Sequence, residues 1–347
     1  MNKIAGLSTP HLAPSSSMET NTRASVGPVP FEEDTPFLSP STTLQEDLVS
    51  TLPSVRNLRC YQGTWLLEQY VTAAIALQRR FHPRHDDVIV ASFPKSGTTW
   101  VNALTFATMA RAAYPPAAAD HPLLRLNPHQ CLPFLEGLFG GGTEAKLEAL
   151  PSPRLMNTHM PLQMLPRASA CKVVYVCREP KDMVVSLWHY IKRAVPELTF
   201  HDSFEYVCSG MVYYGPIWDH ILGYWRASVA TPHSVLFLQY EQLLRDPADN
   251  VRKLARFLGQ PFSAPEEEAD IVGDIVRLCS FGHLQSLEPN RTGSIGPIPR
   301  EALFRKGVVG DWVNHMTPEM ARRLDDIVAD KIHPAGRAQF SVNTNIV

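Results

Sequence analysis

Short apolar runs alternate with amphipathic segments along most of the chain. Three runs have the length and composition of buried strands: 88–93, 172–178 and 234–240. Each precedes a segment of helical character: from Gly97 to about Arg111, from Pro180 onward, and from Pro247 to Leu258. Continuous apolar strands that alternate with helices predict a parallel sheet covered on both faces. We therefore expect an α/β fold, a single domain with a central parallel sheet flanked by helices.

Five further segments complete the expected organisation. The periodicity predicts a helix from Trp65 to Arg80, a strand from Arg154 to His159 and a final helix from about Pro318 to Ile332. Residues 285–304 contain two Gly and three Pro, which indicates a long irregular loop of the kind that often serves as a lid. Leu135 to Thr143 is rich in Gly and is expected to be a flexible stretch, either at a binding site or on the surface.

Composition divides the chain into a tail and a folded part. Residues 1–50 are rich in Ser, Thr and Pro and carry six acidic residues against two basic ones, which predicts a disordered acidic tail. Lys3 is the only basic residue among the first 18, which disfavours a transit peptide. Residues 51–347 are expected to form the one domain, because a 347-residue chain with 44% hydrophobic residues can bury a sizeable core.

Charge and cysteine content limit the partners. The 32 basic and 34 acidic residues give a net charge of -2, so no field for general nucleic-acid binding is expected. Apolar stretches fall short of the roughly 18 residues of a membrane span. The six cysteines lack the spacing of a zinc site or a disulfide scaffold, which indicates reduced thiols. These features predict a cytoplasmic protein that binds neither membrane nor nucleic acid.

The segment after the first apolar run has the composition of an anion-binding loop. It reads P-K-S-G-T-T-W (94–100), in which free backbone N–H groups and the helix dipole would converge and Lys95 would add a positive charge. It lacks the G-x-x-x-x-G-K-[ST] pattern of the phosphate loop. Arg178 ends the second run, where it would attract a phosphate and repel a metal. Glu241 after the third run is either a rival metal ligand or an exposed carboxylate in a first helical turn.

Three separated motifs resemble those of cytosolic sulfotransferases, especially the plant branch. They are S-F-P-K-S-G-T-T-W (92–100), R-E-P-K-D-x-x-x-S (178–186) and F-R-K-G-V-V-G-D-W (304–312). The likeness runs from about residue 60 to 335. It implies that 3′-phosphoadenosine 5′-phosphosulfate (PAPS) is the co-substrate and that the acceptor is a small molecule with a hydroxyl or amine. It implies no metal.

The resemblance also implies which residues bind the nucleotide. For the 5′-phosphosulfate and the adenine it implies Lys95, Ser96, Gly97, Thr98, Thr99 and Trp100. For the 3′-phosphate it implies Arg178, Ser186, Arg305, Lys306 and Gly307, and for the adenine also Tyr240, Ser280 and Phe281. Cys279 stands where the family usually has Thr, so the adenine contacts in that segment are less specific.

His159 is the candidate catalytic base. Histidine can accept a proton near pH 7, and the segment T-H-M-P (158–161) resembles the one that carries the base in this family. Its position at a strand end would alone favour a structural role, which is the usual one for such a histidine. In the expected in-line mechanism His159 takes the hydroxyl proton of the acceptor while Lys95 stabilises charge on the leaving phosphate. Asn157 replaces a Lys of many animal members, which removes one cation.

The acceptor and two alternative functions stay open at this point. A phosphate-loop kinase would depend on magnesium, and a non-catalytic binder would hold nucleotide without turnover. Plant relatives allow flavonoids, brassinosteroids, hydroxyjasmonates, strigolactone-related alcohols or desulfoglucosinolates, and a hydrophobic acceptor is expected. Its pocket, or simply the core, is expected to contain Phe134, Tyr190, Tyr214 and Trp218. Residues 313–322 depart from the animal dimer motif, so a monomer or weak homodimer is expected.

Overall fold

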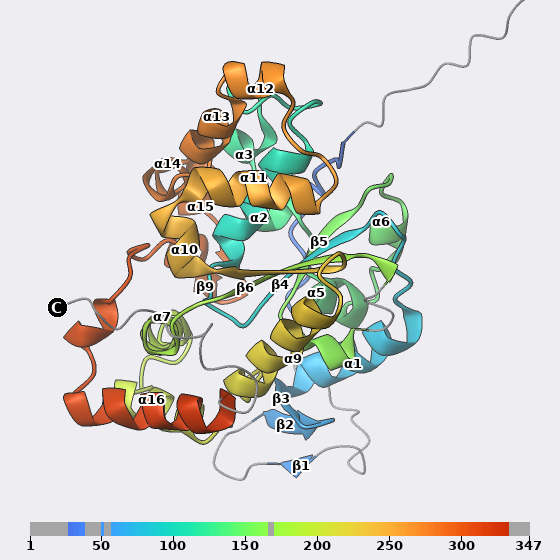
Figure 1. Ribbon diagram of the computed structural model, residues 1–347. Coiled ribbons are helices and arrows are strands. Elements are labelled where there is room, and N and C mark those ends of the chain that lie inside the picture. The colour runs from blue at the N-terminus through green and yellow to red at the C-terminus, as the bar shows by residue number, and fades with distance from the viewer. Residues whose placement is uncertain (1–26, 39–49, 52–56, 166–169, 333–347) are drawn as a thin grey trace, which may run out of the picture.

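A four-stranded parallel sheet forms the centre of the protein (Figure 1). The computed structural model describes residues 27–38, 50–51, 57–165 and 170–332. The strand order is β5-β4-β6-β7, with bounds Leu155–Thr158 (β5), Val88–Ser92 (β4), Lys172–Cys177 (β6) and Val235–Gln239 (β7). The predicted strands and the α/β fold class are confirmed.

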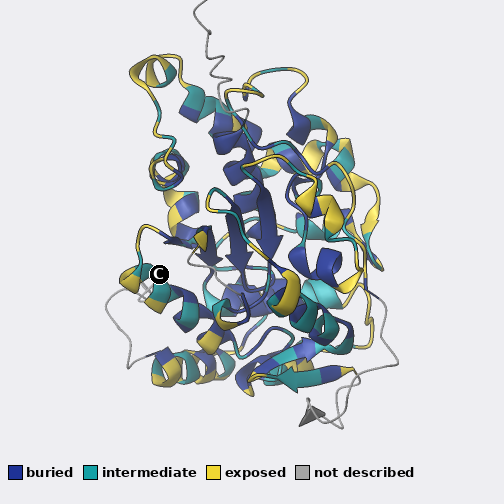
Figure 2. Cartoon of the chain, turned by 90° about the vertical axis from the view of Figure 1, so that its right-hand side faces the viewer, coloured by how far each residue is buried: buried dark blue, intermediate teal, exposed yellow. Residues whose placement is uncertain are grey.

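Alternate residues of each strand face two separate hydrophobic layers. In β4, Val88 and Val90 belong to one core cluster, whereas Ile89 and Ala91 belong to the other. All five residues of β4 are buried, as the dark strands of Figure 2 show. Both faces of the sheet are therefore covered, as continuous apolar strands require.

Helices cover each face (Figure 1). The first layer contains α2 (Thr98–Met109), α4 (Pro128–Cys131), α10 (Tyr240–Arg245), α11 (Pro247–Phe257), α13 (Ile271–Leu278) and α14 (Phe281–Ser286). The second contains α1 (Glu68–Arg80), α5 (Leu135–Gly140), α7 (Pro180–Ile191), α8 (Phe200–Cys208), α9 (Ile217–Ala230) and α16 (Pro318–Ile332). Shorter elements are α3 (Pro122–Arg125), α6 (Ala145–Glu148), α12 (Ala264–Glu268), α15 (Glu288–Arg291), η2 (Leu162–Met164), η4 (Arg300–Leu303) and η5 (Asp311–Asn314).

The parallel register brings four strand ends to one edge of the sheet. Ala91 pairs with Thr158, Ser92 with Val176, and Cys177 with Gln239. The loop at 94–100, Arg178, His159 and Tyr240 all follow these ends directly. Ligands in open α/β sheets bind beyond the carboxyl ends of the strands, so this edge is where a site is expected.

The helix expected from Trp65 begins three residues later. Residues 58–61 (β2) and 64–67 (β3) form an antiparallel hairpin, to which β1 (Ser50–Thr51) adds, and α1 starts only at Glu68. Gln62 and Gly63 have positive φ values of 49° and 79° and make the two-residue turn. The periodicity missed this hairpin because its strands are only four residues long.

Two stretches expected to be irregular are ordered. Residues 135–140 form α5, which packs along α1. Residues 285–304 contain the end of α14, then α15, a small hairpin of β8 (Ser294–Ile295) and β9 (Ile298–Pro299), and η4. Each of these helices and strands is too short to leave a periodic pattern in the sequence.

Part of the expected disordered tail lies against the domain. Residues 27–38, which we call the strap, include buried Phe31 and Leu38. Three acidic strap residues form ion pairs with basic residues of the domain: Glu32 with Arg125, Glu33 with Lys146, and Asp34 with Arg300. The prediction of disorder is therefore wrong for the strap, and the rest of residues 1–50 falls outside the described residues except Ser50 in β1.

Two further expectations concern the state of the cysteines and the presence of membrane-spanning helices. All six cysteines are free thiols, and five of them are buried. No helix in the described ranges is long and apolar enough to cross a membrane.

A buried ion pair joins the beginnings of β4 and β5, and it generates a stability prediction. Arg154 donates to both carboxylate oxygens of Asp87 at 2.9 and 2.6 Å, and both side chains are fully buried. Asp87→Asn removes the fully buried partner of Arg154 and leaves it the half-exposed carboxylate of Glu148 at 3.0 Å, so the substitution should lower the free energy of unfolding by about 3 kcal/mol. Urea unfolding measures this change.

The matched control is the exposed pair of Arg252 and Glu267. Glu267→Gln should cost less than about 1 kcal/mol, because solvent screens an exposed pair. A similar loss of stability in both variants would contradict the structural importance of the Arg154–Asp87 pair.

Candidate active site

The loop between β4 and α2 is shaped by two residues in the left-handed region. Lys95 has φ 68° and Gly97 has φ 111°. A Cβ at Gly97 would lie 2.8 Å from the Tyr240 ring, so both the conformation and the space require glycine. Gly97 is the N-cap of α2, and the first-turn N–H groups therefore face the end of the sheet.

Lys95 is a cation held in partly dehydrated surroundings. Its Nζ lies 4.1 Å from the centre of the Tyr190 ring and 3.5 Å from the carbonyl oxygen of Ala302. Burial lowers the pKa of Lys95 to about 7, and the positive charges of Arg178 and Arg305 act in the same direction. Among the described residues no carboxylate pairs with it. An anion bound here would supply the missing negative charge.

Arg178 and Arg305 bring two guanidinium groups to the same cavity. Arg178 donates to the carbonyl oxygen of Val308 at 2.9 Å, and its guanidinium carbon lies 4.7 Å from the centre of the Tyr240 ring. Within the described part of the chain, the buried Nε atoms of both arginines have no hydrogen-bond partner. Buried donors of this kind normally have one, so two donors are left for a ligand.

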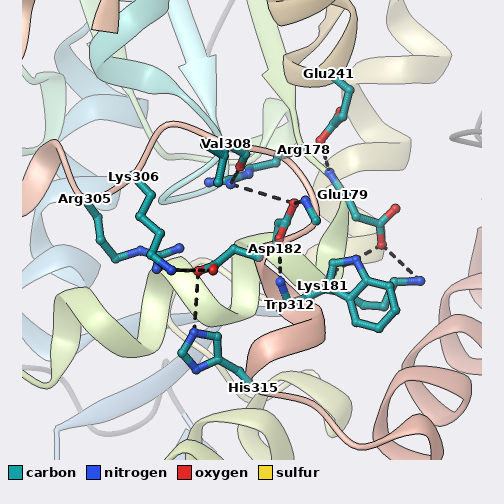
Figure 3. A network of polar contacts seen from close by, with 12 residues as sticks. Arg178, Glu179, Lys181, Asp182, Glu241, Arg305, Lys306, Val308, Trp312 and His315 are labelled. Carbon is teal, nitrogen blue, oxygen red and sulfur yellow. Dashed lines mark hydrogen bonds and ion pairs between the residues drawn. The ribbon is translucent and has the colours of Figure 1, made fainter. Parts of the chain in front are cut away.

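Two aspartates hold the loop that carries Arg305 (Figure 3). Asp311 accepts from Arg305 at 2.5 Å and from Lys306 at 2.6 Å. Burial raises the pKa of Asp311, but the hydrogen bonds from Lys306 and Arg305 outweigh it and hold the pKa well below its usual range. Asp182 on α7 accepts from the backbone N–H groups of Gly310 at 2.6 Å and Trp312 at 3.0 Å. These contacts tie the loop at 304–312 to α7.

Glu241 is not an exposed carboxylate in this structure. It is buried and accepts a hydrogen bond from the backbone N–H of Glu179 at 2.9 Å (Figure 3). Within the described ranges no three His, Cys, Asp or Glu side chains are grouped so as to hold a metal ion. The expectation of an exposed carboxylate is therefore wrong, because the turn after Arg178 covers it.

His159 is oriented by three hydrogen bonds. Its Nδ1 lies 2.8 Å from the carbonyl oxygen of Ser92, so Nδ1 carries the proton and Nε2 keeps its lone pair. Its backbone N–H donates to Glu136 at 2.7 Å, and its carbonyl oxygen lies 2.9 Å from Nε2 of His220. Burial lowers the pKa of His159 to about 4. The hydrogen bond to Ser92 opposes this shift, and the nearby Lys95 adds to it. The ring is therefore neutral at pH 7 and can accept a proton.

One cavity of about 1140 Å³ collects most of the predicted site residues. Its lining includes Lys95, Gly97, Thr98, Thr99, Trp100, His159, Arg178, Ser186, Tyr240, Phe281, Arg305, Lys306 and Gly307. Ser96 and Ser280 are not in that lining; Ser96 is buried, and its N–H donates to the carbonyl oxygen of Phe93 at 3.2 Å. Phe134, Tyr190 and Tyr214 line the cavity, whereas Trp218 lies in the core.

Several lining residues were missed by sequence reasoning. Asp34 to Phe37 of the strap and Ser294 to Ile298 of the small hairpin form part of the wall. The two segments meet, because a Cβ at Gly296 would lie 2.3 Å from the Phe37 ring. The acidic triplet at 32–34 was the available signal, but its basic partners are distant in sequence.

Two ionisable groups beside the base, buried Glu136 and partly buried His129, were also missed. Glu136 accepts the His159 N–H, and burial raises the pKa of Glu136 to about 7. His129 lies 3.0 Å from the hydroxyl of Thr99 through its Nε2. Neither residue belongs to a recognisable motif, and only the fold brings them to the site.

Comparison with known proteins identifies the family. The sulfotransferase domain family matches residues 85–336. Cytosolic sulfotransferase 5 of Arabidopsis thaliana is 42% identical over 304 residues, which cover 83% of this chain and 94% of the relative. Cytosolic sulfotransferase 8 of the same plant is 43% identical over 307 residues, covering 84% and 92%.

Two solved structures agree. A crystal structure of an Arabidopsis thaliana sulphotransferase has a TM-score of 0.67 and 35% identity, covering 86% of this chain and 99% of that one. Mouse sulfotransferase SULT7A1, complexed with PAP, has a TM-score of 0.61 and 26% identity, covering 81% and 95%. The chain belongs to the sulfotransferase family, and its sequence resembles the plant cytosolic members. Its activity is therefore sulfuryl transfer, which sets aside the kinase and the non-catalytic binder.

The contacts of Asp182 generate a prediction about the loop at 304–312. Asp182→Asn replaces a carboxylate that accepts two backbone N–H groups with a weaker acceptor, so the loop should open more often. Trypsin should then cut after Arg305 and Lys306 at least about tenfold faster, since one hydrogen bond to a charged group contributes roughly 1.5 kcal/mol or more. Mass spectrometry of timed digests measures the rate.

Asp325→Asn is the control for this experiment. Asp325 on α16 is half exposed and pairs with Lys181 of α7, the helix that carries Asp182, and it accepts no hydrogen bond from the loop. Equal cleavage rates in Asp182→Asn and Asp325→Asn would show that Asp182 does not hold the loop.

Proposed function

We propose that this protein is a cytoplasmic enzyme that transfers a sulfuryl group from PAPS to a hydroxyl of a small hydrophobic acceptor. Family membership establishes sulfuryl transfer in general. The donor, the acceptor class, the compartment and the roles of individual residues are our proposal. Its main support is the group of cations at the carboxyl edge of the sheet: Lys95, whose pKa is lowered to about 7, and Arg178 and Arg305, whose buried Nε atoms have no partner among the described residues.

The positions of the cations fit a nucleotide that carries one phosphate at the 3′ position and one at the 5′ position of its ribose. Arg178, Arg305 and Ser186 would hold the 3′-phosphate, with the two unpartnered Nε atoms as donors. Lys95 and the first turn of α2 would hold the 5′-phosphosulfate. The mouse relative in complex with PAP supports this kind of ligand.

Aromatic rings next to these cations fit an adenine base. The Trp100 and Tyr240 rings lie 5.6 Å apart between centres, and Phe281 lies against Gly307. A side chain at Gly307, where φ is 67°, would lie 2.4 Å from the Phe281 ring. Glycine at this position therefore keeps the backbone of the loop close to the ring.

His159 would act as the general base. Within the described ranges its Nε2 forms no hydrogen bond, while Nδ1 is engaged by Ser92, and a neutral ring at pH 7 is ready to take the acceptor's hydroxyl proton. Lys95 would stabilise negative charge on the leaving phosphate. In this scheme PAPS supplies the sulfuryl group, and the chain positions the reactants and moves one proton.

The walls near His159 favour a hydrophobic acceptor with a hydroxyl group. The Phe134 and Tyr214 rings each lie 5.4 Å from the imidazole of His159, measured between ring centres. Asn157, which also lines the cavity, adds no charge. A flat or aromatic body would fill this space by apolar contact while its hydroxyl meets the base.

The first prediction from this proposal concerns turnover. Transfer of labelled sulfur from PAPS to a panel of hydroxylated plant metabolites should occur in a buffer with metal chelator. His159→Ala and Lys95→Ala should each reduce it by about two orders of magnitude or more, because each removes a group used in the transition state. Exposed His233 offers a control, and His233→Ala should keep full activity. Near-normal turnover in His159→Ala would reject the base.

The second prediction concerns protons taken up on binding. The pKa of Lys95 is about 7 in the free protein, so at about pH 8 most of the side chain is neutral. A bound phosphate raises that pKa, so binding of 3′,5′-adenosine bisphosphate should take up close to one proton at about pH 8, where the phosphates are already ionised. Below about pH 6 Lys95 is already charged and this uptake should vanish.

Calorimetry in two buffers of different ionisation enthalpy measures the uptake. Lys95→Arg provides the control, because arginine stays charged throughout and should bind without taking up a proton. Identical proton uptake in the wild type and in Lys95→Arg would contradict the titration of Lys95.

A further inference from the structure

A second histidine faces the cavity beside the catalytic base. His129 lies on α4, and its Nε2 is 3.0 Å from Oγ1 of Thr99, the second residue of α2. Both residues line the same cavity as Lys95 and His159. The mechanism described above gives His129 no task.

The position of His129 is fixed by contacts from distant segments. Asn127 caps α4 and accepts the N–H of His129 at 2.9 Å, while its own amide donates to buried Asn290 at 2.8 Å. The strap donates from Glu32 N–H to the carbonyl oxygen of Gln130 at 2.8 Å. These contacts hold the backbone of the four-residue helix α4 on two sides, and from it the His129 ring reaches Thr99.

The ring of His129 is uncharged at neutral pH. Burial lowers the pKa of His129 to about 3, and electrostatic interactions with the neighbouring His159 and Lys95 act in the same direction. Its Nε2 is already engaged with Thr99, so the ring is not a second base for the acceptor. Removing a polar imidazole ring from water costs free energy, and the hydrogen bond to Thr99 offsets part of that cost.

We propose that His129 is a positioning residue for the sulfuryl donor, acting through Thr99. Its Nε2–H donates to Thr99 Oγ1, which fixes the side chain and leaves the single hydroxyl proton of Thr99 free to donate to the 5′ anionic group. If the proton of Thr99 pointed at His129 instead, lone pairs would face the anion. This inference rests on the proposed function, because it needs an anion at the loop 94–100.

Two substitutions at His129 show whether a hydrogen-bond donor at the place of Nε2 is needed, or only a polar side chain of similar size. The amide nitrogen of a glutamine can reach the place of Nε2, whereas that of an asparagine reaches only the place of Nδ1. His129→Asn should weaken binding of 3′,5′-adenosine bisphosphate about tenfold, the effect of one hydrogen bond to a charged group. His129→Gln should bind within about threefold of the wild type, because it restores the donor.

A double-mutant cycle tests whether His129 acts through Thr99. Thr99→Val should weaken binding by at least as much as His129→Asn, and the double variant should bind like Thr99→Val alone. The pH dependence of kcat should keep its shape in His129→Asn, because His159 still supplies the base. Calorimetry and initial rates in a metal chelator measure both readouts.

Each alternative outcome has a distinct meaning. Wild-type affinity in His129→Asn, equal losses in His129→Gln and His129→Asn, or additive losses in the double variant would overturn the positioning role. Failure of the wild type to bind the bisphosphate would overturn the proposed function itself, and the inference with it.

Discussion

Buried positive charge at the carboxyl edge of the sheet is the constraint on which the site depends. Lys95 lies against the Tyr190 ring and the carbonyl group of Ala302, and burial lowers its pKa to about 7. Arg178 and Arg305 each keep a buried Nε without a partner among the described residues. Such groups are costly in the free protein and are stabilised when an anion arrives. The site is therefore prepared for a ligand with two separated anionic groups.

The rest of the architecture keeps these cations in place. Parallel strands deliver the Lys95 loop, Arg178 and His159 to one edge, and Asp182 and Asp311 fix the loop with Arg305. Neither aspartate fills the cavity, since each accepts from groups of the loop itself (Figure 3). The same carboxylates that stabilise the loop thus leave the arginine Nε atoms unused. Stability and ligand binding are served by different atoms of the same residues.

Local patterns predicted the sheet and most of the residues that line the cavity, because both arise from short continuous segments. The apolar run at 88–93 and the loop after it occupy their expected places. The strap could not be predicted, since its order comes from ion pairs such as Asp34 with Arg300, 266 positions apart. His129 and Glu136 were missed for the same reason: four- and six-residue helices carry them, and tertiary contacts alone give them meaning. Ser280 was placed in the site by its motif, yet it does not line the cavity.

The most direct test of the account compares two nucleotides that differ only in the 3′-phosphate. Calorimetry in a metal chelator would give the affinities for 3′,5′-adenosine bisphosphate and adenosine 5′-monophosphate. Charge-assisted hydrogen bonds from Arg178 and Arg305 contribute roughly 1.5–3 kcal/mol each, so the bisphosphate should bind at least about a hundredfold more tightly. Affinities within about threefold of each other would show that the unused donors do not bind a 3′-phosphate.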